Sequence, residues 1–157
     1  MNNFIFNKEQ SFVMHNVYCK YYLMDIKKPL MVTFGAANSH IASSELVNSP
    51  SPWAFDYIKK KGINVISFSS IDSDCWYRNK EFHNYLKSVS KNISIFSERL
   101  GYGGSMGAYG ISAYSNTLNL TRVLLFCPVS TLNKIIVPFE DRFEINSRTK
   151  DWEEYIP

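Results

Sequence analysis

The sequence predicts an α/β fold, with a mostly parallel β-sheet and helices on both of its faces. Short continuous apolar runs, typical of strands buried on both faces, alternate along the chain with longer segments of helical periodicity. The composition agrees, because 157 residues with 45% hydrophobic and 20% charged side chains suit one globular core. We therefore expect residues 1–157 to form a single domain.

The first elements are strands at the edge and centre of this sheet. Residues 11–24 mix apolar and polar positions, which indicates one or two antiparallel strands at a sheet edge. Residues 29–34 form a continuous apolar run that ends at Gly35, as expected for a central strand. The next run of this kind covers residues 63–68.

A helix is predicted between the two central strands, over residues 52–61. Pro52 suits the first turn of a helix, and Gly62 follows at its end. Strand, helix and strand in this order make a βαβ unit, which requires the two strands to be parallel.

The second half of the chain repeats the alternation. Residues 79–91 predict an amphipathic helix whose buried stripe has the spacing i, i+3, i+4 and i+7, namely Phe82, Tyr85, Leu86 and Val89. Extended segments at 93–96 and 98–102 then precede a helix over 106–116. Residues 122–127 form the last predicted strand, and nine of the fifteen residues from 140 to 154 are charged, which indicates a solvated tail.

Charge and cysteine usage exclude several classes of protein. The net charge of +3 is spread along the chain, and its one basic run, residues 59–61, falls at a predicted helix end, so no nucleic-acid partner is expected. Cys19, Cys75 and Cys127 form no C-x-x-C pair, so we expect buried free thiols, no metal site and no cofactor. Without a leader peptide or a membrane-spanning run, the sequence reads as cytoplasmic.

The segment Gly103-Gly104-Ser105-Met106-Gly107 carries the main functional signal. It places a serine in a Gly-x-Ser-x-Gly frame between a predicted strand and a predicted helix, the pattern of a nucleophile elbow. Five of the seven glycines lie between residues 101 and 110, where a sharp turn would leave no room for side chains. Ser105 is therefore the candidate catalytic nucleophile.

The same segment has two competing interpretations. A tight turn with a passenger serine would give the same letters. A phosphate-binding loop fits poorly, because no lysine follows the glycines and the dinucleotide-binding frame fails at Met106.

An acyl-transfer serine needs an oxyanion hole. In this architecture one N–H group comes from the residue after the nucleophile, here Met106, and another from the loop after an earlier strand. Gly35 and Ala36 occupy that loop position, although a simple turn explains their small size nearly as well.

The general base is the missing part. His15, His40 and His83 all precede Ser105, whereas a hydrolase of this pattern has the order serine, acid, histidine. His40 follows the oxyanion loop and is the weak candidate for a substitute base. Asp141 could offer a carboxylate, with a solvated acidic tail as the simpler explanation.

Aromatic residues follow the strand predicted at 63–68. Trp76 and Tyr77 at the rim of a sheet could stack on a sugar or another flat apolar group, and core packing is an equal alternative. Arg142 could recognise an anionic group, but a salt bridge to a neighbour is simpler.

Five segments together resemble α/β-hydrolase-like proteins of bacterial cell-surface polysaccharide clusters. These segments are residues 32–36, 75–77, 102–110, 127–130 and 137–140. The resemblance covers most of the chain from residue 30 onward. It implies a partial α/β-hydrolase-like fold, Ser105 as nucleophile, and an esterase, acetylesterase or deacylase activity on an acylated or sugar substrate.

Relatives of this kind continue for roughly another hundred residues, through two strands that bring the acid and the histidine. The expectation is therefore a truncated or split hydrolase that is inactive alone, and whose incomplete edge binds a partner chain or a second copy. The alternative is a non-catalytic binding or assembly component of surface-polysaccharide production.

Overall fold

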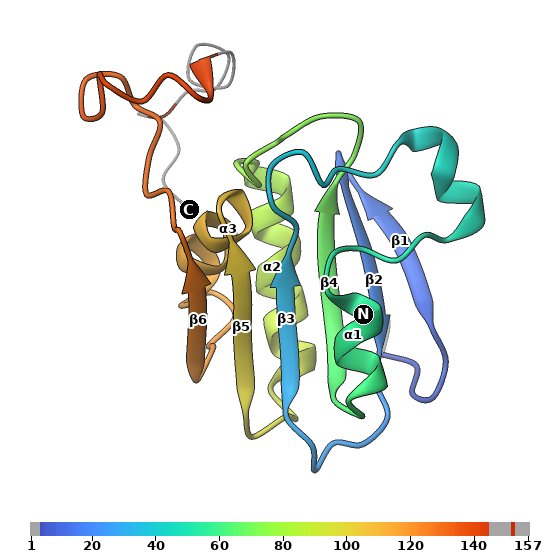
Figure 1. The fold of residues 1–157 in the computed structure, drawn as a ribbon. Helices are drawn as coiled ribbons and strands as arrows, with labels where there is room; N and C mark the ends of the chain where they lie inside the picture. Colours follow the sequence, from blue (N-terminus) through green and yellow to red (C-terminus); the bar gives the residue numbers. More distant parts are fainter. Residues whose placement is uncertain (1–3, 145–151, 153–157) are drawn as a thin grey trace.

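A computed structural model of the protein describes residues 4–144 and Trp152 (Figure 1). Six strands form one sheet in the order β1-β2-β4-β3-β5-β6. The strands are β1 (Gln10–Met14), β2 (Val17–Tyr22), β3 (Leu30–Phe34), β4 (Asn64–Ser70), β5 (Arg99–Gly104) and β6 (Arg122–Phe126). The predicted α/β class is confirmed.

The sheet is parallel except at one side. Strand β3 pairs in parallel with β4 and β5, and β5 pairs in parallel with β6. Strands β1 and β2 form an antiparallel pair, and β2 is also antiparallel to β4. The antiparallel strands predicted at the sheet edge are thus confirmed.

Helices cover both faces of the sheet, as predicted. In Figure 1, α1 (Phe55–Lys60) lies in front of the sheet, while α2 (Lys80–Ile93) and α3 (Met106–Tyr114) lie behind it. A short 3-10 helix, η1 (Ser43–Asn48), precedes α1 and was not predicted. Helix α1 begins three residues after Pro52, because Ala54 has a φ of 65° and cannot belong to the helix.

Helix α2 is longer than the sequence pattern indicates. The Asn79 side chain accepts hydrogen bonds from the N–H groups of Glu81 and Phe82, which fixes the helix start. Ile93 continues the buried stripe four residues after Val89, so the extended segment predicted at 93–96 is wrong. Strand β5 begins later, at Arg99.

Aromatic side chains fill the space between the sheet and the two rear helices. Phe34 on β3 lies 4.9 Å from Phe68 on β4 and 4.8 Å from Tyr77, measured between ring centroids. Phe82 of α2 and Tyr114 of α3 complete this core at 5.7 Å from each other. Both rear helices are therefore anchored to the middle of the sheet.

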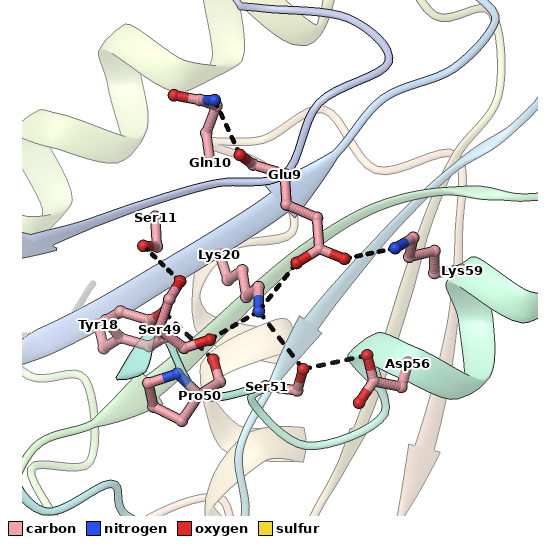
Figure 2. Close-up of polar contacts among 10 residues, drawn as sticks. All are labelled: Glu9, Gln10, Ser11, Tyr18, Lys20, Ser49, Pro50, Ser51, Asp56 and Lys59. Atoms are coloured by element: carbon pink, nitrogen blue, oxygen red, sulfur yellow. Dashed lines mark hydrogen bonds and ion pairs between the residues drawn. The ribbon is translucent and has the colours of Figure 1, made fainter. Parts of the chain in front are cut away.

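A buried lysine organises the front face near α1 (Figure 2). Lys20 on β2 is 5% exposed, and its Nζ atom lies 3.0 Å from Glu9 Oε2 and 2.7 Å from the Ser49 carbonyl oxygen. Glu9 also pairs with Lys59 of α1. The hydrogen bond from Lys59, together with Lys20, lowers the pKa of Glu9, and the cluster ties β2 to the connection before α1.

Residues 127–144 extend beyond the end of β6 (orange in Figure 1). The predicted solvated tail covers 140–154, of which residues 140–144 and Trp152 are described and the others lie outside the described residues. Trp152 is 7% exposed, so this residue of the tail is buried.

Candidate functional site

Ser105 stands at the turn from β5 into α3, at the carboxyl rim of the parallel strands. Strand β5 ends at Gly104 and α3 begins at Met106, so the predicted strand-turn-helix unit is confirmed. Ser105 has φ 51° and ψ −121°, a conformation that residues with a side chain rarely adopt. Such a backbone costs on the order of 1–3 kcal/mol and is kept only where its surroundings enforce it.

Two glycines fix this turn, because the absence of a Cβ atom lets main-chain segments of β3, β5 and α3 come into direct contact. A Cβ atom on Gly107 would lie 2.1 Å from the Phe34 carbonyl oxygen, and one on Gly103 would lie 2.5 Å from the Gly107 carbonyl oxygen. Neither backbone atom can move away as the end of a flexible side chain could. Helix α3 therefore sits directly against the ends of β3 and β5 and holds Ser105 above them.

The Ser105 hydroxyl has no partner in the described part of the chain. Its side chain is partly exposed, and among residues 4–144 and Trp152 no group forms a hydrogen bond with it. The N–H group of Met106 lies in the first turn of α3, where no intrahelical acceptor exists. The start of the helix also carries a partial positive charge, which favours a developing negative charge beside Ser105.

The loop after β3 offers one of its two predicted oxyanion donors. The Gly35 N–H donates to the Phe68 carbonyl at 2.8 Å, so it is engaged inside the sheet. The Ala36 N–H has no acceptor among the described residues, and Ala36 is partly exposed. The geometry therefore narrows the candidate oxyanion donors to Ala36 and Met106.

A hydrogen bond from Tyr77 holds the loop that follows β3. Its hydroxyl donates to the Gly35 carbonyl at 2.9 Å. The N–H of Ala36 belongs to the same trans peptide and so points away from Tyr77. Burial raises the pKa of Tyr77 well above its usual value, so the hydroxyl stays protonated and able to donate.

The predicted substrate-stacking role of Trp76 and Tyr77 does not fit their position. Both side chains are 0% exposed, and their rings pack against other aromatic rings, Tyr77 against Phe34 and Trp76 against Tyr109. An enclosed ring has no free face for a sugar. Core packing, the alternative interpretation of these residues, describes them.

An aromatic cluster surrounds Trp76, and the sequence pattern did not predict it. Tyr109, one helical turn after Ser105, lies 5.8 Å from Trp76 and 5.7 Å from Trp152 between ring centroids. Arg78 donates to the Tyr109 hydroxyl at 2.7 Å and lies 4.5 Å from the Trp152 ring. The spacing of four residues from Ser105 could have identified Tyr109, but nothing in the sequence pairs it with Arg78.

His40 lies beside a carboxylate at the rim of the sheet. Its Nδ1 atom is 3.7 Å from Asp74 Oδ1, and the same carboxylate oxygen accepts the Asn38 N–H at 2.9 Å. This pair joins the loops after β3 and β4, which reach the same rim as Ser105. His40 was a candidate from the sequence, whereas Asp74 was missed as its carboxylate neighbour.

His15 and His83 have structural partners. His15 lies in the turn between β1 and β2 and pairs with Glu81 at 2.6 Å, at the far side of the sheet from β5. His83 Nε2 is 3.1 Å from Thr117 Oγ1, beyond the end of α3 that lies away from Ser105. Burial, with a smaller effect of Lys87, lowers the pKa of His83.

The acidic residues after β6 pair with neighbouring cations. Asp141 is exposed and lies 3.2 Å from Lys134 Nζ. Glu140 pairs with Arg142, whose hydrogen bonds lower the pKa of Glu140 to about 2. Arg142 thus forms a salt bridge with a neighbouring residue, which was the simpler of its two interpretations from the sequence.

The described part of the chain offers neither a metal cluster nor a membrane-spanning helix. Within it, no group of three or more histidine, cysteine, aspartate or glutamate side chains is placed to hold a metal ion. No helix among these residues combines the length and hydropathy needed to cross a bilayer.

Solved structures of a capsule-modifying enzyme have a similar fold. A capsule O-acetyltransferase of Neisseria meningitidis serogroup A, a histidine-to-alanine mutant in complex with CoA, matches with a TM-score of 0.55 and 17% identity over 85% of this chain. Another structure of that enzyme matches with a TM-score of 0.51 and 15% identity over 83% of this chain. The chain spans 56% and 55% of the lengths of those two chains. No protein-family model and no curated protein sequence matches.

Proposed function

We propose that Ser105 is the nucleophile of a serine-type acyl-transfer site, which accepts an acyl group from an ester or thioester. The observation that carries this proposal is the backbone of Ser105, held at φ 51° and ψ −121° by glycine contacts to neighbouring main chain. This strained backbone stands between a strand and a helix and projects a partly exposed hydroxyl, which is the arrangement of a nucleophile elbow.

The reaction follows from the groups around the hydroxyl. Ser105 Oγ attacks the acyl carbonyl carbon while a base takes the hydroxyl proton, and the carbonyl oxygen becomes an oxyanion. The N–H groups of Ala36 and Met106 are the proposed donors to that oxyanion. When this oxyanion intermediate collapses, it expels the alcohol or thiol, which takes up the proton held by the base. The acyl group is then esterified to Ser105. Attack by water or a sugar hydroxyl then releases it.

The proposed substrate class is an acylated saccharide or its acyl donor. The similar solved structures are described as a capsule O-acetyltransferase, and one of them contains CoA. Acetyl esters of saccharides and acetyl-CoA are therefore the first donors to test. The low sequence identity means that a fold likeness alone supports this choice.

The proposal leaves the general base unassigned. The Ser105 hydroxyl has no hydrogen-bond partner among residues 4–144 and Trp152, so no imidazole is engaged with it in this structure. His40, with Asp74 beside its Nδ1, is the first histidine to test by substitution.

Labelling with a fluorophosphonate tests the nucleophile directly. We expect the reagent to modify Ser105 slowly, located by peptide mass spectrometry, because a single modification needs no turnover and the proposed Ala36 and Met106 donors would stabilise the charge that develops on the phosphoryl oxygen. The S105A variant should not be labelled. S112A removes an exposed serine from the same helix and should be labelled like the wild type.

A turnover assay distinguishes a serine that can only be labelled from a complete catalytic site with a general base. A general base contributes roughly 10²–10⁴-fold, so the 157-residue chain should hydrolyse p-nitrophenyl acetate no faster than S105A. A clear Ser105-dependent rate would instead place a working base within this chain. Absence of any labelling at Ser105 would reject the proposal and favour a binding or assembly component.

A further inference from the structure

The outer edge of β6 carries unpaired main-chain groups. Among the described residues β6 pairs with β5 alone. The Ser105 N–H donates to the Phe126 carbonyl at 2.9 Å, so Phe126 directs its main chain toward β5. Because alternate residues of a strand face the same neighbour, Leu124 also faces β5, whereas Val123 and Leu125 direct their N–H and C=O groups outward.

The side chains of β6 are apolar and exposed. Val123, Leu124 and Phe126 are 45%, 55% and 50% exposed, although they belong to a strand of a parallel sheet. Figure 1 shows β6 at the end of the sheet, with α3 behind it and no helix in front of it. An apolar strand with free main-chain groups is a template for another strand.

We propose that two copies of this chain associate through β6, which pairs with β6 of the second copy in antiparallel orientation around Leu124. A two-fold axis relates two identical edges, and it necessarily makes the paired strands antiparallel. The resulting sheet is continuous across both copies.

The hydrogen-bonding groups select this register. With Leu124 on the axis, Val123 faces Leu125 of the second copy, and both have outward main-chain groups that can exchange hydrogen bonds. Centring on Val123 would instead place Leu125 opposite Thr121, whose N–H already donates to Arg99. Centring on Leu125 would bring in Cys127, whose φ of 44° takes the chain out of the strand.

The side chains are self-complementary in the same register. Leu124 meets Leu124 of the second copy, and Arg122 lies across from Phe126 of the second copy, where a guanidinium can stack on the ring. Arg122 is the single charged residue of β6, so no like charges face each other. This charge pattern is the reason to choose a second copy as the occupant.

Cysteine cross-linking tests the register. The experiment uses a Cys127→Ser background, because Cys127 is an exposed free thiol. The expectation of a buried thiol is thus wrong for Cys127, while Cys19 and Cys75 are buried as expected. Leu124→Cys places two thiols opposite each other with Cα atoms about 4.5 Å apart, within disulfide range. Val123→Cys places its two thiols two residues out of register, roughly 8 Å apart, which is too far. We expect an intermolecular disulfide from the first variant and not from the second.

Light scattering on the full 157-residue chain tests the association itself. We expect twice the 18.1 kDa chain mass for the wild type and the single chain mass for Leu124→Lys, which opposes two cations on the axis. The matched control is Val13→Lys, at a 46% exposed apolar residue of β1 on the opposite edge, and it should leave the dimer intact. A monomeric wild type, a dimer broken by Val13→Lys instead, or equal cross-linking of both cysteine variants would overturn the proposal.

Discussion

Strands β5 and β6 are neighbours of similar length, yet the structure uses them in opposite ways. In β5, a Cβ atom on Gly103 would lie 2.5 Å from the Gly107 carbonyl oxygen of α3, and one on Gly101 would lie 2.7 Å from the Ile111 side chain. Strand β6 contributes Leu124 and Phe126, which remain about half exposed at 55% and 50%. The glycines of β5 let α3 pack closely against this strand, while Leu124 and Phe126 of β6 remain exposed, so side-chain size alone does not locate the core.

This contrast predicts that substitutions of similar size have very different effects on the two strands. Close packing of β5 against α3 leaves no room for added side-chain atoms, whereas the exposed side chains of Leu124 and Phe126 bury little surface in one copy. The largest effects are therefore expected where α3 touches main chain, and the smallest far from it.

Gly107→Ala should be the most destabilising change. Its methyl group would lie 2.1 Å from the Phe34 carbonyl oxygen, and main chain cannot yield without moving β3. We expect a loss of about 4 kcal/mol or more in the free energy of unfolding, measured by urea denaturation. Gly104→Ala is the matched control, because its nearest neighbour would be 3.9 Å away. An equal loss in both variants would contradict the close-contact explanation.

Truncation of a large side chain should distinguish α3 from β6. Ile111 of α3 is 0% exposed, so Ile111→Ala should cost about 2–5 kcal/mol. Leu124→Ala removes the same volume from a 55% exposed site and should cost less than about 1 kcal/mol in dilute solution. Comparable losses of unfolding free energy in the two variants would show that the Leu124 side chain is buried within a single copy.

Ser105→Gly should stabilise the protein relative to Ser105→Ala, although both lack the proposed nucleophile. Glycine adopts φ 51° and ψ −121° without strain, whereas alanine keeps the Cβ atom that makes this conformation costly. We expect a difference of about 1 kcal/mol between the two variants by thermal denaturation. If the variants are equally stable, the turn stores no strain.

The smallest effect on stability is expected at Glu9, which precedes β1 at the opposite edge of the sheet. The pKa of Glu9 is lowered by Lys59 and Lys20, so its contribution to stability is present above pH 4.5, its ordinary value, and is lost as the pH falls through the lowered value. Glu9→Gln should therefore flatten the fall of the melting temperature below pH 4.5. A pH profile unchanged by this substitution would show that the ion pairs of Glu9 with Lys20 and Lys59 carry no such effect.

The local parts of the site could be read from the sequence. Glycines at 103 and 107 around Ser105 predicted the strand-turn-helix unit, because close contacts between chain neighbours depend on residue size at fixed spacing. Continuous apolar runs likewise predicted β3, β4 and β6. The segment at 93–96 failed because Ile93 fits a helix stripe as well as a strand.

The sequence by itself determined the order of strands and helices and the place of Ser105 between β5 and α3, since both depend on contacts within short stretches of chain. Only the tertiary structure decided which N–H groups stay free, because the Gly35 N–H is taken by Phe68 on a strand that lies far away in the sequence. It also decided that Trp76 and Tyr77 enter the core while Leu124 and Phe126 stay exposed. Burial depends on which elements pack over a residue, and no pattern within one element contains that information.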